Sequence, residues 1–186
     1  TYSVSHDLKA PLRAVNNLAE WIQKDNAEAL TSSSQEHLVK LRTRVARMER
    51  LLEDLLTYSR VGRQRHQPEL VDTAALIRGL RYILVAPPGF RIELHMPLPV
   101  LHTERVPLEM ILRNLIGNAI KHHDRPAAGI VEISAAERGD WVEFVVKDNG
   151  PGIAPEYHER IFQIFQSLRP RDEVEGSGMG LAIAKK

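Results

Sequence analysis

Three short blocks in the second half of the chain decide its fold: NLIGNAIKHH at residues 114–123, DNGPGI at 148–153 and GSGMGL at 176–181. Asn114 and Asn118 lie one helical turn apart, so both amides occupy the same face of a predicted helix. The two later blocks are rich in glycine, which leaves backbone amides able to face phosphate oxygens beside a helix N-terminus. In this order, the three blocks predict a nucleotide pocket.

The residues of these blocks suit a magnesium nucleotide. Mg²⁺ prefers oxygen ligands and keeps several waters, so a neutral amide oxygen on this helix, from Asn114 or Asn118, is an adequate single protein ligand. Lys121 could hold phosphate charge, and Asp148, at a predicted strand end, could accept a hydrogen bond from an exocyclic amine. Each feature alone has a plainer interpretation, because asparagines also decorate solvated helix faces and Asp-Asn-Gly is a common turn. The absence of a Walker A motif and of G-x-G-x-x-G disfavours the usual phosphate-binding loops.

Apolar residues in the first 60 positions step by three and four, which predicts two amphipathic helices. The first stripe runs through residues 4–22 and the second through residues 38–55. Ser33 and Glu36 form a capping box at the start of the second helix. Two such helices cannot bury their apolar seams alone, so we expect a homodimer joined in a four-helix bundle.

A domain boundary is predicted at residues 60–69, which are charged and lack periodicity. Beyond it, helices and strands alternate, with Asp72 and Thr103 as helix caps and a hairpin turn at residues 138–140. The predicted elements are helices at 73–84 and 104–122 and strands at 91–96, 129–137 and 141–147. We therefore predict an α+β chain, in which a helical hairpin precedes an α/β sandwich with a mixed sheet and helices on one face.

Composition limits the classes of partner and chemistry. The 186 residues are 43% hydrophobic and 26% charged, as in an ordinary globular protein, and the absence of cysteine excludes disulfides and thiolate metal sites. A net charge of +1 and 5% aromatic residues offer neither the field nor the stacking platform for nucleic acid, so we expect no nucleic-acid partner. Five histidines show no metal-ligand spacing and are expected at the surface or in loops: His66, His95, His102, His123 and His158.

No apolar run approaches the length of a membrane span. We therefore expect this portion to be cytoplasmic, and the parent protein to be either soluble or membrane-anchored. Near the start of the chain, the run SHDLKAPL at residues 5–12 places His6 beside Asp7 at a helix start. Alone, such a pair is usually a solvated capping dipeptide. With a nucleotide pocket in the same chain, the His6 imidazole can accept a phosphoryl group, and Asp7 can fix its tautomer.

Taken together, five blocks resemble the sensor histidine kinases of two-component systems, in the order of that family and across nearly the whole chain. They are the H box SHDLKAPL, the N box RNLIGNAIKHH, the first glycine box DNGPGI, the phenylalanine box RIFQIFQSL and the second glycine box GSGMGL. The resemblance implies a dimerisation and histidine-phosphotransfer domain at 1–62 and a Bergerat-type ATP-binding catalytic domain at 63–186. Because the last strands of the family would follow Lys186, we expect the second domain to be truncated at its C-terminus.

The resemblance also implies roles for single residues. His6 is the phosphoacceptor and Asp7 its catalytic neighbour, while Asn118 ligates Mg²⁺ and Asp148 recognises the adenine of ATP. Phe165, together with Phe162, anchors the base of a lid. The implied nucleotide-binding residues are Asn114, Asn118, Lys121, His122, Asp148, Gly150, Gly152, Phe165, Gly176, Gly178 and Gly180. The implied partners are a second copy of the chain, the receiver domain of a response regulator and an upstream sensor domain.

Two positions depart from the pattern of the family. Ala10 stands where a threonine or asparagine often assists water, which puts phosphatase activity in doubt. Asn114 stands where gyrase-type relatives carry a water-activating glutamate, so hydrolysis of ATP alone should be slow. The predicted function is an ATP-dependent histidine kinase core that autophosphorylates His6 and transfers the phosphoryl group to an aspartate of a response regulator. The alternatives are a degenerate dimeric nucleotide-binding scaffold without phosphotransfer and a gyrase-like ATPase.

Overall fold

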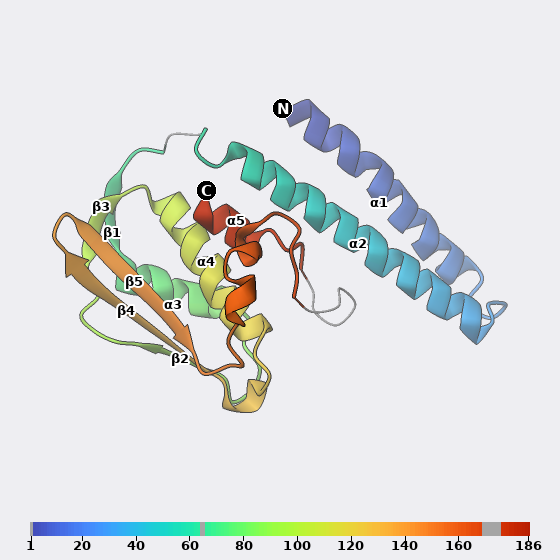
Figure 1. The fold of residues 1–186 in the computed structure, drawn as a ribbon. Coiled ribbons are helices and arrows are strands. Elements are labelled where there is room, and N and C mark those ends of the chain that lie inside the picture. Colours follow the sequence, from blue (N-terminus) through green and yellow to red (C-terminus); the bar gives the residue numbers. More distant parts are fainter. Residues whose placement is uncertain (1, 64–65, 169–175) are drawn as a thin grey trace.

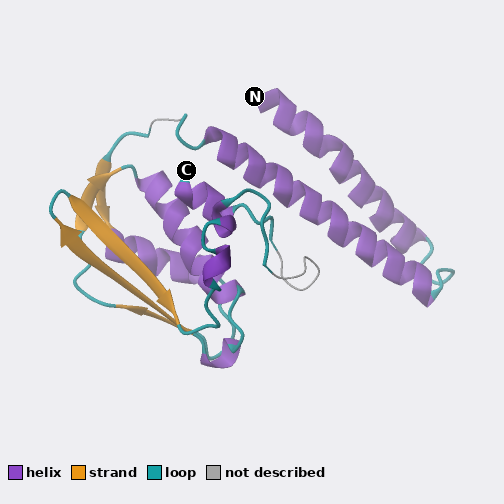
Figure 2. Cartoon of the chain, viewed as in Figure 1, coloured by secondary structure: helices purple, strands orange, loops and turns teal. Residues whose placement is uncertain are grey.

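The computed structural model describes the backbone of residues 2–63, 66–168 and 176–186, and the side chains of these residues from Asp7 onward. A long helical hairpin stands beside a layered α/β part (Figure 1), and the helices of that part gather on one side of the strands (Figure 2). The helices are α1 (Tyr2–Asp25), α2 (Ser32–Arg60), α3 (Thr73–Ile83), α4 (Arg105–Lys121) and α5 (Gly180–Lys185). The strands are β1 (Glu69–Asp72), β2 (Arg91–Leu94), β3 (Val100–Thr103), β4 (Ile130–Arg138) and β5 (Trp141–Asp148), and short 3₁₀ turns occupy Pro126–Ala128, Pro155–Tyr157 and Arg160–Phe162.

The hairpin of α1 and α2 confirms the two helices predicted from the apolar stripes. The predicted cap of the second helix is wrong. Thr31 is the N-cap, and its Oγ1 accepts a hydrogen bond from the Ser34 amide at 3.2 Å. Since α2 begins at Ser32, Ser33 already lies inside the helix and cannot cap it. None of the helices in the described part of the chain combines the length and apolar content that a membrane crossing needs.

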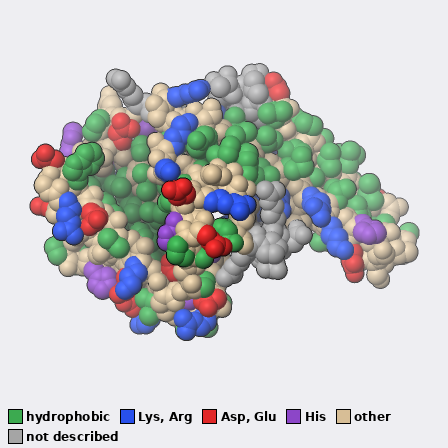
Figure 3. All heavy atoms as spheres, in the orientation of Figure 1, with side chains coloured by type: hydrophobic (Ala, Val, Ile, Leu, Met, Phe, Trp, Pro, Cys, Tyr) green, Lys and Arg blue, Asp and Glu red, His purple; other side chains and the backbone are tan. Residues whose placement is uncertain are grey.

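Much of the apolar surface of the hairpin stays open to solvent. Among its described residues, Ala19 and Val45 are the buried hydrophobic side chains. Two stripes with heptad spacing remain between 40% and 51% exposed. Their members are Leu8, Val15 and Ile22 on α1 and Leu41, Met48 and Leu55 on α2. Hydrophobic side chains gather along the hairpin in the space-filling view (Figure 3).

A mixed sheet confirms the predicted fold class. β2 pairs with β4 in parallel, and β4 pairs with β5 in antiparallel register around Gly139, whose φ of 63° suits a tight hairpin turn. Helices α3 and α4 pack against one face of this sheet. Their shared core consists mainly of Val71, Ile77, Leu80, Leu112, Ile116, Val131 and Ile133.

A second, two-stranded sheet was not predicted. β1 and β3 pair in antiparallel register, from Glu69 opposite Thr103 to Asp72 opposite Val100. Thr103 therefore ends β3, and the predicted Thr103 cap is wrong because Glu104 occupies the N-cap of α4 without a side-chain hydrogen bond. The predicted Asp72 cap of α3 is confirmed, since its Oδ1 accepts a hydrogen bond from the Ala75 amide at 2.9 Å.

His123 connects the end of α4 to the DNGPGI loop; it lies in a loop, as one of the two expected places, but it is buried, with 7% of its surface exposed. Its Nδ1 accepts a hydrogen bond from the Arg125 amide at 3.0 Å, which assigns the ring proton to Nε2. Nε2 then donates to Asn149 Oδ1 at 2.8 Å, and the same oxygen accepts a hydrogen bond from the Ile130 amide at 2.7 Å. Asn149 also donates from Nδ2 to the Ala128 carbonyl at 3.2 Å. The side chain of Asn149 thus holds the backbone in place directly after Asp148.

Replacing Asn149 with alanine should lower the free energy of unfolding by about 1–3 kcal/mol, because the buried His123 Nε2–H would lose its acceptor. Urea denaturation followed by circular dichroism measures the change. Asn17→Ala, at an exposed position of α1, is the matched control and should change the stability by less than about 0.5 kcal/mol. Equal stabilities for the Asn149 and Asn17 variants would contradict the role given to this network.

Candidate active site

A cavity of about 740 Å³ lies between α4, β5 and the glycine-containing segments that follow β5. A volume of this size is within the range of small-molecule sites in proteins. The wall includes nine of the eleven residues that were predicted to bind nucleotide. These are Asn114, Asn118, Lys121, His122, Asp148, Gly152, Gly176, Gly178 and Gly180. The two that do not line it are Gly150 and Phe165.

Helix α4 supplies the polar floor of this cavity. Asn114 and Asn118 lie one turn apart and both line it, as do Lys121 near the helix C-terminus and the capping residue His122. On the opposite face of the same helix, Leu112 and Ile116 are buried in the core. The 3.6-residue period of one helix therefore separates a core face from a cavity face.

The second glycine block closely approaches this floor. A Cβ atom added at Gly180 would lie 3.0 Å from Asn114 Oδ1, and one added at Gly178 would lie 2.5 Å from the Gln166 carbonyl oxygen. Gly178 also has a φ of 72°, a conformation that residues with side chains rarely adopt. The backbone path thus requires glycine at position 178, and a side chain at position 180 would crowd Asn114, because the start of α5 lies beside this residue of α4.

Asp148 ends β5 and presents its carboxylate at the cavity wall. Its Oδ1 accepts a hydrogen bond from the Gly150 amide at 2.8 Å, and a Cβ atom at Gly150 would lie 2.7 Å from that oxygen. Gly150 therefore shapes the loop around the carboxylate rather than the cavity wall itself. An ionised carboxylate accepts hydrogen bonds and donates none, which suits an amine donor on a ligand.

Phe165 lies outside the cavity wall and is 36% exposed, with a φ of 61° that is unusual for an aromatic residue. Its neighbours Gln166, Ser167 and Leu168 line the cavity instead. Phe162 packs elsewhere, with Lys185 Nζ 5.1 Å from the centre of its ring. The role of the two phenylalanines at the base of a lid remains a prediction.

Several lining residues were missed from the sequence, and Asp54 is the most unexpected because it belongs to α2 of the hairpin. The C-terminal segment contacts the same helix. Lys186 Nζ donates a hydrogen bond to the Tyr58 carbonyl at 2.7 Å and lies 4.3 Å from the centre of the Tyr58 ring. No local pattern marks Asp54, because only the contact between the hairpin and the α/β part brings it to the wall. The other missed residues include Leu115, Ala119, Glu143, Ile153, Ile161, Gln166 and Leu181.

The predicted phosphoacceptor residues belong to α1. His6 lies in that helix, but its side chain is outside the described residues. Asp7 is exposed and does not line the cavity. The structure thus brings nine of the eleven residues predicted to bind nucleotide together in one wall, and it leaves Asp7 outside that wall.

Comparison with known proteins identifies two domains. Residues 1–64 match the His Kinase A (phospho-acceptor) domain, and residues 103–186 match the histidine kinase-, DNA gyrase B- and HSP90-like ATPase family. The phytochrome-like protein Cph1 of Synechocystis is 36% identical over 100% of this chain and 25% of its own length. The sensor protein CreC of Escherichia coli is 32% identical over 100% of this chain and 39% of its own length.

Solved structures share the arrangement of the two parts. Full-length ShkA in complex with AMPPNP has a TM-score of 0.72 and 28% identity, covering 99% of this chain and 39% of ShkA. The Acinetobacter baumannii histidine kinase AdeS, at 23% identity and a TM-score of 0.61, shares the fold over 96% of this chain and 83% of its own. The chain spans about a quarter of the length of the cyanobacterial phytochromes that it matches. With a phospho-acceptor domain followed by an ATPase domain, the chain belongs to the sensor histidine kinases of two-component systems.

Proposed function

We propose that this chain is the catalytic core of an ATP-dependent protein histidine kinase, which phosphorylates its own His6 and passes the phosphoryl group to an aspartate of a response-regulator receiver domain. The observation that carries the proposal is the single cavity lined by the N box and both glycine blocks, in a chain whose first 64 residues match a phospho-acceptor domain. We assign residues 1–62 to dimerisation and phosphotransfer and residues 63–186 to ATP binding and catalysis.

ATP is the proposed phosphoryl donor, and Mg²⁺ its companion ion. The ATPase match over residues 103–186 supports ATP, as does the likeness to ShkA, a protein solved in complex with AMPPNP. The donor chemistry of the wall fits Mg²⁺, because Asn118 offers a neutral amide oxygen on the same helix face as the Lys121 ammonium. The ion would neutralise charge on the phosphate oxygens, and Asp148 would accept a hydrogen bond from the adenine amine.

The transfer step needs little chemistry from side chains. A nitrogen of the neutral His6 imidazole attacks the γ-phosphorus in line, a nitrogen–phosphorus bond forms, and the bond to the β,γ-bridging oxygen of ADP breaks. The imidazole needs no separate base to deprotonate it before attack, and Asp7 orients the ring by accepting a hydrogen bond from its other nitrogen. Because Asp7 does not line the cavity, transfer requires the ATP-binding part to approach an α1 helix, in the same or in the partner subunit.

A homodimer is the proposed assembly. The two exposed stripes of the hairpin repeat every seven residues, which is the pattern of helices that pack in a bundle. A second hairpin packed on them would remove this apolar surface from water. An upstream sensor domain in the full-length protein and a cytoplasmic location of this portion complete the proposal.

Replacing His6 with glutamine should abolish phosphorylation of the protein, because glutamine offers no nucleophilic imidazole nitrogen. Incubation with γ-labelled ATP, followed by acid and base treatment, measures an acid-labile and base-stable label. His37→Gln, at an exposed histidine of α2, is the control and should retain the label. If the unsubstituted chain binds ATP but takes up no such label, the chain is a degenerate nucleotide-binding scaffold. Steady phosphate release that is unchanged in His6→Gln would favour the gyrase-like ATPase.

Two substitutions in the cavity wall should separate recognition of the base from binding of the metal. Asp148→Asn should lower the affinity for ATP about tenfold or more, both with and without Mg²⁺. The NH₂ group of the asparagine would place a donor opposite the adenine amine, where the carboxylate offered an acceptor. Asn118→Ala should remove the extra affinity for ATP that Mg²⁺ confers, because the ion would lose its amide ligand. The affinity for ATP without metal should stay nearly unchanged. Calorimetric titrations in magnesium and in EDTA measure both effects. Loss of affinity of the same size for the two variants under both conditions would contradict the assigned roles.

Introducing a charge into an exposed stripe should dissociate the dimer. Met48→Glu is expected to raise the dimer dissociation constant at least about 100-fold, because both copies would bury a carboxylate in an apolar seam. Sedimentation velocity over a concentration series measures the change. Val85→Glu, which alters an equally apolar residue exposed outside the hairpin, should leave the dimer intact. A Met48 variant that dimerises like the parent protein would place the interface elsewhere.

A further inference from the structure

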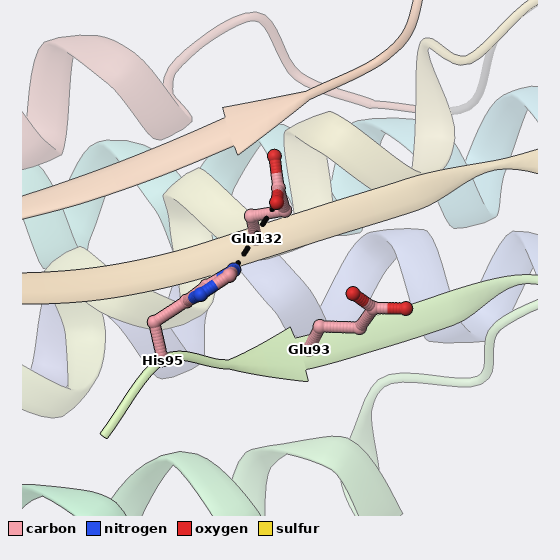
Figure 4. Close-up of side chains that lie close together, drawn as sticks. All are labelled: Glu93, His95 and Glu132. Atoms are coloured by element: carbon pink, nitrogen blue, oxygen red, sulfur yellow. Dashed lines mark hydrogen bonds and ion pairs between the residues drawn. The ribbon is translucent and has the colours of Figure 1, made fainter. Parts of the chain in front are cut away.

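A group of metal-ligating side chains lies on the face of the mixed sheet opposite to α3 and α4. It consists of Glu93 on β2, His95 just after β2 and Glu132 on β4 (Figure 4). Their ligand atoms all lie within 4.8 Å of one another. We propose that these three residues form a binding site for a divalent transition-metal ion of the zinc type, separate from the nucleotide cavity.

The backbone holds the three side chains on one face. In the parallel register of β2 and β4, Glu93 lies beside Glu132, whereas their neighbours Ile92 and Val131 point into the core. The His95 amide donates to the Ile133 carbonyl at 2.9 Å, which continues the pairing beyond the end of β2. His95 is therefore held two residues after Glu93 on the same side of the sheet.

The distances suit a small ion after a modest adjustment of side chains. His95 Nε2 lies 3.1 Å from Glu132 Oε1. Two ligands bound to zinc at about 2.0–2.1 Å in tetrahedral geometry are about 3.3 Å apart, so this pair is already near the required separation. The side chains are between 38% and 54% exposed, which leaves Glu93 room to close the remaining gap. A histidine nitrogen among the ligands favours zinc over Mg²⁺ or Ca²⁺, which prefer oxygen.

Two basic side chains lie beside the two carboxylates of the group. Two glutamates side by side on neighbouring strands repel each other. Two cations offset this repulsion: Arg91 Nη1 lies 3.1 Å from Glu93 Oε1, and Lys147 Nζ lies 3.7 Å from Glu132 Oε2. Each cation contacts one carboxylate oxygen, and one ligand atom from each of the three residues still lies within 4.8 Å of the other two. The two basic residues also compete with a metal, so removing one of them should strengthen metal binding.

The direct test is a titration of the full chain with Zn²⁺ alone, in competition with a chromophoric zinc chelator. The parent protein is expected to bind Zn²⁺ with a dissociation constant in the micromolar range. His95→Gln and Glu132→Gln should each weaken Zn²⁺ binding at least about 10-fold, because loss of a direct ligand costs no less than loss of a residue that only orients one. Lys147→Gln should tighten it severalfold, because it removes a positive charge beside Glu132.

His102→Gln is the matched control, since His102 is an exposed histidine on β3 outside the group. It should bind Zn²⁺ like the parent protein. Circular dichroism and thermal denaturation without metal establish that the variants fold, and Zn²⁺ should raise the midpoint of unfolding for the parent protein but not for His95→Gln. The proposal is overturned if the parent protein binds no Zn²⁺ below about 100 µM, or if the His95→Gln titration superimposes on that of the parent.

Discussion

Helix α4 has an apolar face that must be buried and a polar face that lines the cavity, and the rest of the α/β part is arranged around these two requirements. Leu112 and Ile116 must leave water, and they do so against the sheet and α3. The same packing fixes the rotation of the helix, so that Asn114 and Asn118 face the cavity. Burial of the apolar face therefore orients the polar groups, and no hydrogen bond is needed to choose their direction.

The loops around the cavity follow from this placement. The second glycine block passes so close to Asn114 that a side chain at Gly180 would crowd the amide oxygen. On the other side, His123 and Asn149 join the end of α4 to the loop after β5. The positions of Asn118 and Asp148 are thus related through a short chain of contacts, at whose centre lies the buried His123.

Periodicity and local hydrogen bonding explain what could be predicted from the sequence. Long stripes predicted α1 and α2, a short loop at residues 138–140 marked the hairpin of β4 and β5, and a side-chain acceptor before an apolar run identified Asp72 as a cap. Features that depend on distant segments were missed. β1 and β3 have four residues each and pair only with one another, so their short sequences carry little pattern. Burial of His123 depends on Phe90, whose ring packs edge-on at 5.4 Å, and Asp54 reaches the cavity only through the contact between α2 and the α/β part.

The position of Asp54 has a thermodynamic consequence for the whole molecule. Asp54, which lines the ligand cavity, belongs to the long helix α2 that also carries one of the two exposed apolar stripes, and Lys186 contacts the same helix at Tyr58. A turn of α2 about its axis therefore changes the shape that a bound ligand meets. Reciprocity then requires that occupancy of the cavity bias the rotation of the helix by the same free energy. Rotation of α2 and occupancy of the cavity are therefore two parts of one coupled equilibrium.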